Sequence, residues 1–250
     1  MKIYFFGADI DILDKLYDSW FDGGLFLFNS QSGDAFTRIA RKLNKDKQFK
    51  YMVALRPYVM SPQYLVMIND TFYNICSRNN KLQINLISGH IKEEEKGFGG
   101  IIGEVNDSSP GIDKSKYLID FVHVINNFNK EKIPDIYISA TNQYTFDVAK
   151  QYGHKVIMPY SQYLSKEYDL DPKNTMISIG PILRDSESDF GGLLDFNHPN
   201  DSKYFTPLQF KDTLDQFKRE GFKEVIIFGW PDKEKERVIE FVKKYKEGKI

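Results

Sequence analysis

Short apolar runs alternate with amphipathic stretches along almost the whole chain. The runs are rich in β-branched and aromatic residues, a pattern typical of strands buried on both faces of a parallel sheet. Eight runs occur, at 3–6, 25–28, 51–55, 84–87, 136–139, 155–158, 176–183 and 224–228. Apolar residues at helical spacing occupy 12–21, 35–43, 63–77, 116–128, 144–152, 207–220 and 233–245. Eight strand–helix units in 250 residues predict one (β/α)8 TIM barrel, trimmed and with short helices.

Two connections depart from this regular pattern. The stretch 160–171 carries only a weak helical signal, and the polar segment 185–207 predicts one long loop over the barrel mouth. The main alternative to a barrel is an open doubly wound sheet, whose first strand is normally followed by a glycine-rich phosphate turn. Here that turn reads FFGADID and holds one glycine, Gly7, so the barrel is favoured.

Composition excludes several classes of partner. The 34 basic and 35 acidic residues give a net charge of -1, which provides no field to attract nucleic acid. A single cysteine, Cys76, cannot form an internal disulfide, as is usual in a reducing compartment. No run of eighteen apolar residues predicts a membrane span, and the start MKIYFFGADI does not match a signal peptide. We therefore expect a cytoplasmic protein that binds neither nucleic acid nor membrane.

Active sites of (β/α)8 barrels lie at the carboxyl ends of the strands, and carboxylates are scarce there in this chain. The four histidines, His90, His123, His154 and His198, have no metal-ligand spacing, so we expect no metal site. A glycosidase is excluded because it needs two flanking carboxylates. His90 follows the fourth strand and would face the mouth. We expect structural roles for His123, within a helix, and for His154, near a helix end, where an imidazolium is favourable.

The strand ends supply hydroxyl, amide and aromatic groups instead. Ser139-Ala140-Thr141-Asn142 leads into a helix and predicts either a phosphate cradle or an ordinary N-cap. The sequence pattern alone leaves both interpretations open. Tyr58, Tyr160 and Trp230 are candidate walls for a flat aromatic ligand.

Two neighbouring runs resemble a known family. YMVALRPYVMSP followed by KLQINLISGH is similar to the third and fourth strands of the bacterial luciferase-like flavin monooxygenases, particularly the alkanesulfonate monooxygenase branch. SGDAF, DKSKY, PDIYISATN and GFKEVIIFGWP resemble further segments of that family. The resemblance implies a TIM barrel that binds reduced FMN at its mouth, or in one branch the deazaflavin F420.

The resemblance also implies roles for single residues. A non-prolyl cis or bulged peptide of the third strand maps near Val53 and Ala54, beneath the flavin. The implied cofactor-binding residues are Val53, Ala54, Asn85, Tyr117, Ser139, Ala140 and Thr141. The pocket candidates are Ser32, Arg56, Tyr58, His90 and Trp230, with Arg56 suited by its charge to an anion.

The chain departs from the family at several catalytic positions. Ser32 stands in place of a cysteine, Ser178 and Gly180 in place of an arginine and a histidine of the seventh strand, and Trp230 in place of a tyrosine. The arginine-bearing lid is reduced to about 186–205. The flavin site is therefore expected to remain, and specificity for sulfonates to be lost.

These observations lead to one functional hypothesis with two alternatives. The hypothesis is a two-component monooxygenase that takes reduced FMN from a separate reductase and oxidises a small organic substrate with O2. The alternatives are a flavin-binding protein without oxygenase turnover and an F420- or flavin-dependent oxidoreductase. The resemblance further implies a homodimer or higher homo-oligomer formed through helices around the second and third strands, with Phe72, Tyr73 and Ile75 as contributors or as plain core residues.

Overall fold

The computed structural model describes residues 1–28, 33–42, 48–75, 82–88, 112–129, 131, 133–186, 202–229 and 232–250. The chain forms two compact units. One unit comprises residues 1–24 and 157–250, and the other comprises residues 25–156. Strands β2 (Gly23–Leu27) and β6 (Lys155–Pro159) cross the two boundaries.

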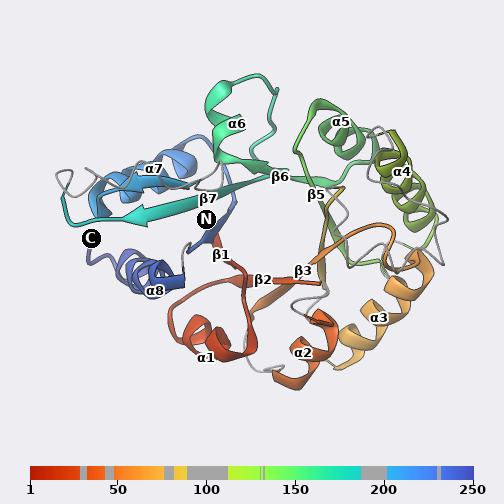
Figure 1. The fold of residues 1–250 in the computed structure, drawn as a ribbon, viewed down its shortest axis with the longest axis horizontal. Helices are drawn as coiled ribbons and strands as arrows, with labels where there is room; N and C mark the ends of the chain where they lie inside the picture. The colour runs from red at the N-terminus through yellow and green to blue at the C-terminus, as the bar shows by residue number, and fades with distance from the viewer. Residues whose placement is uncertain are drawn as a thin grey trace. The chain divides into compact units, whose positions relative to one another are not determined.

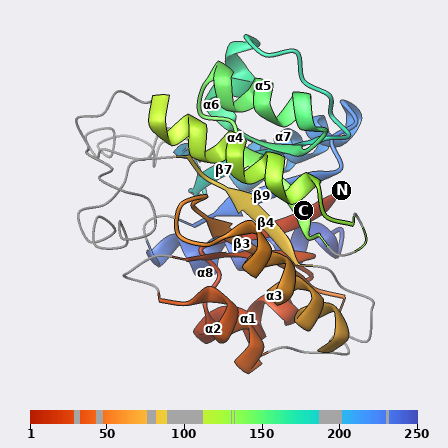
Figure 2. The ribbon, with the colours of Figure 1, turned by 90° about the vertical axis from the view of Figure 1, so that its right-hand side faces the viewer.

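The unit of residues 25–156 alternates strands and helices. Its elements are α2 (Ala35–Lys42), β3 (Lys50–Leu55), α3 (Pro62–Ile75), β4 (Gln83–Leu86), α4 (Ile112–Asn126), β5 (Asp135–Ser139) and α5 (Gln143–Tyr152). Strands β3, β4 and β5 are parallel neighbours. The helices follow one another along the outside of these strands (Figure 1), and α3 and α4 lie side by side (Figure 2).

The unit of residues 1–24 and 157–250 is built on four strands in the order β1, β9, β7, β8. Its elements are β1 (Lys2–Phe6), α1 (Ile10–Asp18), α6 (Tyr160–Ser165), β7 (Thr175–Leu183), β8 (Ser202–Phe205), α7 (Pro207–Arg219), β9 (Glu224–Phe228) and α8 (Asp232–Lys246). Strand β7 is long enough for two partners, because Met176–Ile179 pair with β9 and Gly180–Leu183 pair with β8.

The sheet order shows the fold class. The strands run in the order β6-β5-β4-β3-β2-β1-β9-β7-β8, and β6 also pairs with β7. Eight parallel strands therefore close into a barrel, and β8 is an addition to β7 outside the ring. The predicted (β/α)8 barrel is confirmed, and the open doubly wound sheet is excluded.

Local sequence explains where the helices begin. Asn142 and Thr206 each accept a hydrogen bond from the backbone three residues ahead, and the side chain of that third residue bonds back to the cap. These reciprocal bonds satisfy helix N–H groups that have no partner within the helix. Pro207, at the first helical position of α7, has no N–H to satisfy.

Three predicted segments differ from the structure. The segment 185–207 is not one loop, because β8 lies within it and pairs with β7 in parallel register. The weak connection after β6 begins with a helix of six residues, α6. Helix α4 starts at Ile112, four residues before the predicted start. Cys76 lies outside the described residues.

Candidate active site at the carboxyl ends of the barrel strands

Two residues that the resemblance assigned to the cofactor meet on neighbouring strands. Asn85 lies opposite Tyr137 in the register of β4 and β5, so Asn85 and Ser139 project from the same face. The Ser139 hydroxyl donates a hydrogen bond to Asn85 Oδ1 at 3.0 Å. Asn85 is 2% exposed, whereas Ser139 is half-buried. This bond fixes the Asn85 side chain next to the start of the turn that leads into α5.

The turn itself is closed by an N-cap. Asn142 is the cap residue, and its Oδ1 accepts a hydrogen bond from the Thr145 N–H at 2.9 Å. In return, Thr145 Oγ1 accepts hydrogen bonds from the N–H groups of Thr141 at 3.2 Å and Asn142 at 3.4 Å. The N-cap interpretation of the sequence is therefore correct, with Asn142 rather than Thr141 as the cap. Ala140 is fully buried, and Thr141 is exposed.

A second polar pair follows β3. Arg56 Nη1 donates a hydrogen bond to Tyr58 Oη at 3.2 Å, and both side chains are largely buried. Tyr58 also lines a cavity of about 210 Å³ between the start of α3 and α4, together with Tyr117. The structure thus brings the predicted residues Tyr58 and Tyr117 to one cavity.

Strand β3 has no bulge where the resemblance implied a cis or bulged peptide, and the cis alternative stays a prediction. Its pairing with β4 continues without a bulge from Met52 to Leu55, and Ala54 lies opposite Asn85. Side chains alternate along a strand, so Ala54 shares the face of Asn85 and Val53 lies on the other face. The implied roles of Val53 and Ala54 in cofactor binding stay predictions.

Three predicted pocket residues, Ser32, His90 and Trp230, lie outside the described residues. His198 and residues 187–201 of the reduced lid also lie outside the described residues.

The presence of glycine at position 180 has a steric explanation. Gly180 and Phe228 occupy adjacent positions on β7 and β9, and a Cβ atom added to Gly180 would lie 2.1 Å from Phe228 Cε2. The Phe228 ring also packs edge-on against Phe6, with ring centroids 5.8 Å apart. An aromatic ring therefore fills the space that a side chain at position 180 would occupy. Ser178, two residues earlier on the same face of β7, remains half-buried.

The expectation for His154 is wrong in its charge. His154 is half-buried before β6, and its Nε2 is buried without a partner in the described part of the chain. Loss of hydration disfavours the imidazolium and lowers the pKa of His154 to about 4. The side chain is therefore neutral near pH 7, despite its position after a helix end.

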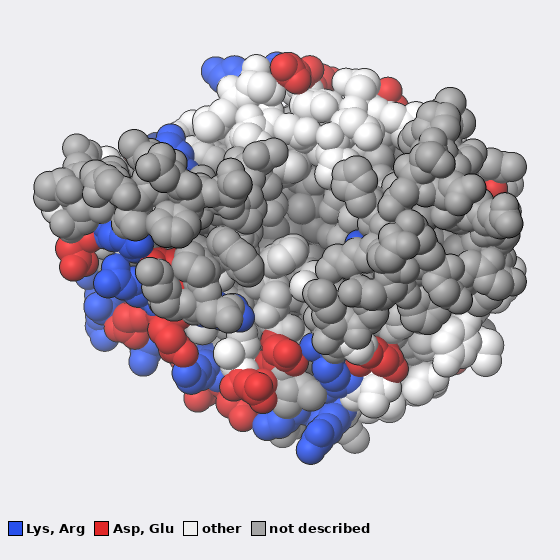
Figure 3. Space-filling model, in the orientation of Figure 1, with Lys and Arg blue, Asp and Glu red and all other residues white. Residues whose placement is uncertain are grey.

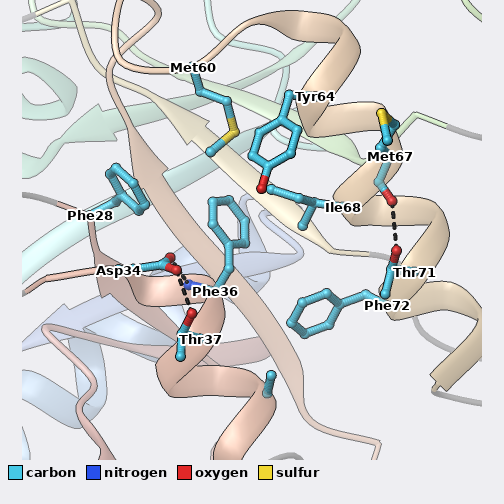
Figure 4. A pocket seen from close by; sticks show the side chains of 11 residues that line it. Phe28, Asp34, Phe36, Thr37, Met60, Tyr64, Met67, Ile68, Thr71 and Phe72 are labelled. Carbon is cyan, nitrogen blue, oxygen red and sulfur yellow. Dashed lines mark hydrogen bonds between the residues drawn. The ribbon is translucent and has the colours of Figure 1, made fainter. Parts of the chain in front are cut away.

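A larger apolar cavity of about 510 Å³ lies between α2 and α3. Figure 4 shows Phe36 of α2 pointing toward Tyr64 and Ile68 of α3 across this cavity. Tyr64 is 55% exposed and Met67 is 65% exposed, whereas Phe72 is buried. Of the residues expected in an interface, Phe72 is thus a core residue, and Ile75 at 38% exposure is accessible.

The surface charge and the possible metal ligands do not point to a further site in the described part of the chain. Lys and Arg side chains are interspersed with Asp and Glu over α8, with no large area of one sign (Figure 3). Among the residues with described side chains, no group of three or more His, Cys, Asp or Glu is placed to hold a metal ion. No helix in the described ranges is long and apolar enough to cross a membrane.

Comparison with known proteins places the fold. No protein-family model and no curated protein sequence matches the chain. The EDTA monooxygenase of Chelativorans sp. BNC1 matches in structure with a TM-score of 0.68 and 9% identity, over 99% of this chain and 93% of that one. Riboflavin lyase with modified FMN matches with a TM-score of 0.71 and 7% identity, over 99% and 92%. The chain has the fold of the luciferase-like monooxygenases.

Another structure with this fold is named for a different cofactor, coenzyme F420. The coenzyme F420-dependent tetrahydromethanopterin reductase of Methanopyrus kandleri matches with a TM-score of 0.64 and 12% identity, over 98% of this chain and 97% of that one. The resemblance read from the sequence is confirmed at the level of this fold. The alkanesulfonate branch stays a prediction.

On this luciferase-like fold, sequence reasoning missed two sets of polar residues. Thr145 was missed, although the spacing of Asn142 and Thr145 fits a capping box and was visible in the sequence. The second set is Glu234 alone, which forms an ion pair at 2.8 Å with Arg184, a residue that the sequence does place at a strand end. They lie 50 residues apart, and no local pattern connects them.

Proposed function

We propose that the protein is a two-component, FMN-dependent monooxygenase that oxidises a small organic substrate with O2, using reduced FMN from a separate reductase. The observation that carries the proposal is the hydrogen bond between Ser139 and Asn85, two residues on different strands to which the resemblance assigns cofactor binding. It lies at the carboxyl end of the strands, where active sites of this fold occur. The fold shared with an EDTA monooxygenase supports the proposed reaction class, and the fold shared with a riboflavin lyase bound to modified FMN supports the proposed cofactor.

The residues of the β5–α5 turn fit the phosphate of FMN. The turn offers the hydroxyls of Ser139 and Thr141 and the N-terminus of a ten-residue helix, whose dipole favours an anion. No acidic residue occurs from 136 to 146, so no carboxylate within this segment repels the phosphate. Ala140 is small and fully buried, which lets the backbone approach the ligand closely.

Each side chain has a definite task in the proposed reaction. Ser139 and Thr141 would hold the phosphate, and the hydrogen bond from Ser139 holds the Asn85 side chain in place beside them. When bound, reduced FMN supplies the electrons that activate O2. Arg56, oriented by Tyr58, places a positive charge at the end of β3 and orients an anionic group of the substrate.

One observation favours a flavin-binding protein without oxygenase turnover. The Phe228 ring fills the space at Gly180, where the resemblance places a polar catalytic residue. An assay separates the two functions. The protein is mixed with dithionite-reduced FMN and air over a panel of sulfonates, aminocarboxylates, alkanes and aldehydes. A binder without turnover yields no oxygenated product from any of them, despite tight binding of FMN.

Cofactor binding is tested by titrating apoprotein with oxidised FMN, dithionite-reduced FMN and F420, followed by fluorescence. The Ser139→Ala/Thr141→Ala variant is expected to bind reduced FMN at least about tenfold more weakly, a loss of about 1.4 kcal/mol. The matched control is Ser165→Ala/Thr37→Ala, which makes the same changes at two exposed positions of α6 and α2. Equal affinity in both variants contradicts the proposed cradle, and preference for F420 contradicts FMN.

We also propose a homodimer formed through α3. Tyr64, Met67 and Ile75 form an exposed apolar stripe on a helix that carries a single charged residue, Asp70. Exposed apolar patches of this kind are usual at protein interfaces. The cavity between α2 and α3 lies beside the same stripe (Figure 4) and accepts side chains of the second subunit.

A further inference from the structure

A buried carboxylate oxygen next to the end of β9 has no partner among the described residues. Glu234 lies in the first turn of α8 and is 2% exposed. Its Oε1 accepts a hydrogen bond from Arg184 Nη1 at 2.8 Å, whereas its Oε2 is buried and accepts none. A buried, ionised acceptor without a donor is unfavourable, and each such group calls for an explanation. A donor from a bound molecule would remove this cost.

The partner of Glu234 is fixed in place. Arg184 Nη1 also donates to the Leu183 carbonyl at 2.7 Å, and the guanidinium lies 5.9 Å from the centre of the Tyr204 ring on β8. Arg184 nevertheless keeps 14% of its side chain exposed. The guanidinium is therefore held by three contacts, and its side chain is not fully closed off from solvent.

Arg184 and Glu234 follow the carboxyl ends of strands β7 and β9. Arg184 directly follows β7, and α8 begins four residues after β9 ends. A Cβ atom on Gly229 would lie 2.7 Å from Lys235 Cα and 3.1 Å from the Glu234 carbonyl carbon, so the first turn of α8 packs on the end of β9. Strands β7 and β9 are parallel neighbours, and in this fold the loops after such strand ends build the active site.

The existing ion pair limits the kind of ligand. Glu234 is already paired with the Arg184 guanidinium at 2.8 Å, and Arg237 Nη1 donates to the Leu183 carbonyl at 2.9 Å. A cationic donor at Glu234 Oε2, such as an ammonium group, would lie close to the positive charge of Arg184. A neutral N–H group meets no such repulsion. Arginine only donates hydrogen bonds and an ionised glutamate only accepts them, so the pair presents one donor edge beside one acceptor.

We infer that Arg184 and Glu234 bind a neutral ligand group in which an N–H donor lies beside a C=O acceptor, as in an amide, a lactam or an imide. The N–H donates to Glu234 Oε2, and the C=O accepts from the guanidinium of Arg184. An organic substrate and the pyrimidine ring of a flavin are two sources of this group. The inference goes beyond the proposed function, because it rests on residues of one compact unit and requires no flavin.

The test compares two lactams that differ in one hydrogen-bond donor. 2-Pyrrolidone has adjacent N–H and C=O groups, and N-methyl-2-pyrrolidone has no N–H. Binding to the wild-type protein is measured by saturation-transfer NMR. We expect 2-pyrrolidone to bind at least about tenfold more tightly than its methylated form. Equal binding of the two lactams, or no binding of either, overturns the inference, and this comparison needs no variant that folds poorly.

Variants then assign the site. In Glu234→Gln, Arg184 retains the amide oxygen and the NH2 group faces the ligand donor, so we expect 2-pyrrolidone binding to fall about tenfold. Arg184→Lys keeps the charge but removes the planar edge, and we expect a similar fall. The matched control Glu240→Gln changes an exposed residue of the same helix and is expected to leave binding unchanged. Unchanged binding in Glu234→Gln overturns the inference.

Titration of the same variants with FMN separates the two sources of the group. Weaker FMN binding in Glu234→Gln assigns the N–H to the flavin, and unchanged FMN binding assigns it to the substrate. If the wild-type protein distinguishes the lactams but binds no flavin, the proposed function fails and this inference holds. If it binds FMN but does not distinguish the lactams, the inference fails alone.

Discussion

The replacement Gly180→Ala tests whether the Phe228 ring is the reason for a glycine in β7. The added Cβ would lie 2.1, 2.4 and 2.8 Å from three carbon atoms of that ring. Carbon atoms in favourable contact are about 3.5–4.0 Å apart, so the ring must move by more than 1 Å in the direction of β9. Phe6, packed edge-on against Phe228, limits this movement.

The magnitude follows from the cost of overpacking a core. One additional methyl group in a well-packed site typically costs about 1–3 kcal/mol. In a chain of this size each kcal/mol lowers Tm by about 2–4 °C. We therefore expect Gly180→Ala to lower the free energy of unfolding by about 1–3 kcal/mol, measured by urea denaturation followed by tryptophan fluorescence.

A double-mutant cycle isolates the contact. Phe228→Leu removes the ring atoms that collide with the new methyl group, so Gly180→Ala should cost much less in that background than in the wild type. The difference is the coupling energy between the two positions, expected at about 1 kcal/mol or more. An equal cost in both backgrounds, or no cost in the wild type, would refute the steric explanation.

Three further predictions concern other parts of the chain. Because the pKa of His154 is lowered to about 4, the unfolded chain binds a proton between pH 6.5 and pH 4 that the folded chain does not bind. In urea titrations, the free energy of unfolding of the wild type should therefore fall by about 2–3 kcal/mol over this pH range, relative to His154→Asn. Parallel pH profiles of the two proteins would contradict this prediction. Asn142→Ala should cost about 0.5–2 kcal/mol through loss of the α5 cap, and Asn142→Asp much less, with thermal unfolding as the measurement; equal losses argue against the cap. Met67→Lys should convert the proposed dimer to a monomer in light scattering, whereas a monomeric wild type rules out the dimer.

The sequence predicts the barrel because the pattern that defines it is local. Eight apolar runs separated by amphipathic stretches are visible without any knowledge of contacts, and β1, β3, β7 and β9 begin within one residue of their predicted starts. Strand β8 was missed for the opposite reason. Its four residues, SKYF, lie at the end of a polar segment, and only the pairing with the extended end of β7 makes them a strand.

The candidate site likewise contains some features that the sequence predicts and others that depend on tertiary structure. Asn85 and Ser139 could be chosen from the sequence because the family resemblance covers both, and the structure adds the bond between them. The space that Phe228 takes at Gly180 could not be read from the sequence, since it depends on the register between β7 and β9. The Arg184–Glu234 pair depends on the packing of α8 against Gly229, which is likewise a tertiary property.

The cap of α5 sets a limit on how tightly an anion can be held there. The N–H groups of Thr141 and Asn142 already donate to Thr145 Oγ1, so an arriving phosphate exchanges one acceptor for another instead of satisfying idle donors. The gain in free energy is then only the difference between a charged and a neutral acceptor. The cap therefore makes this turn a weaker anion site than a helix N-terminus whose N–H groups have no acceptor.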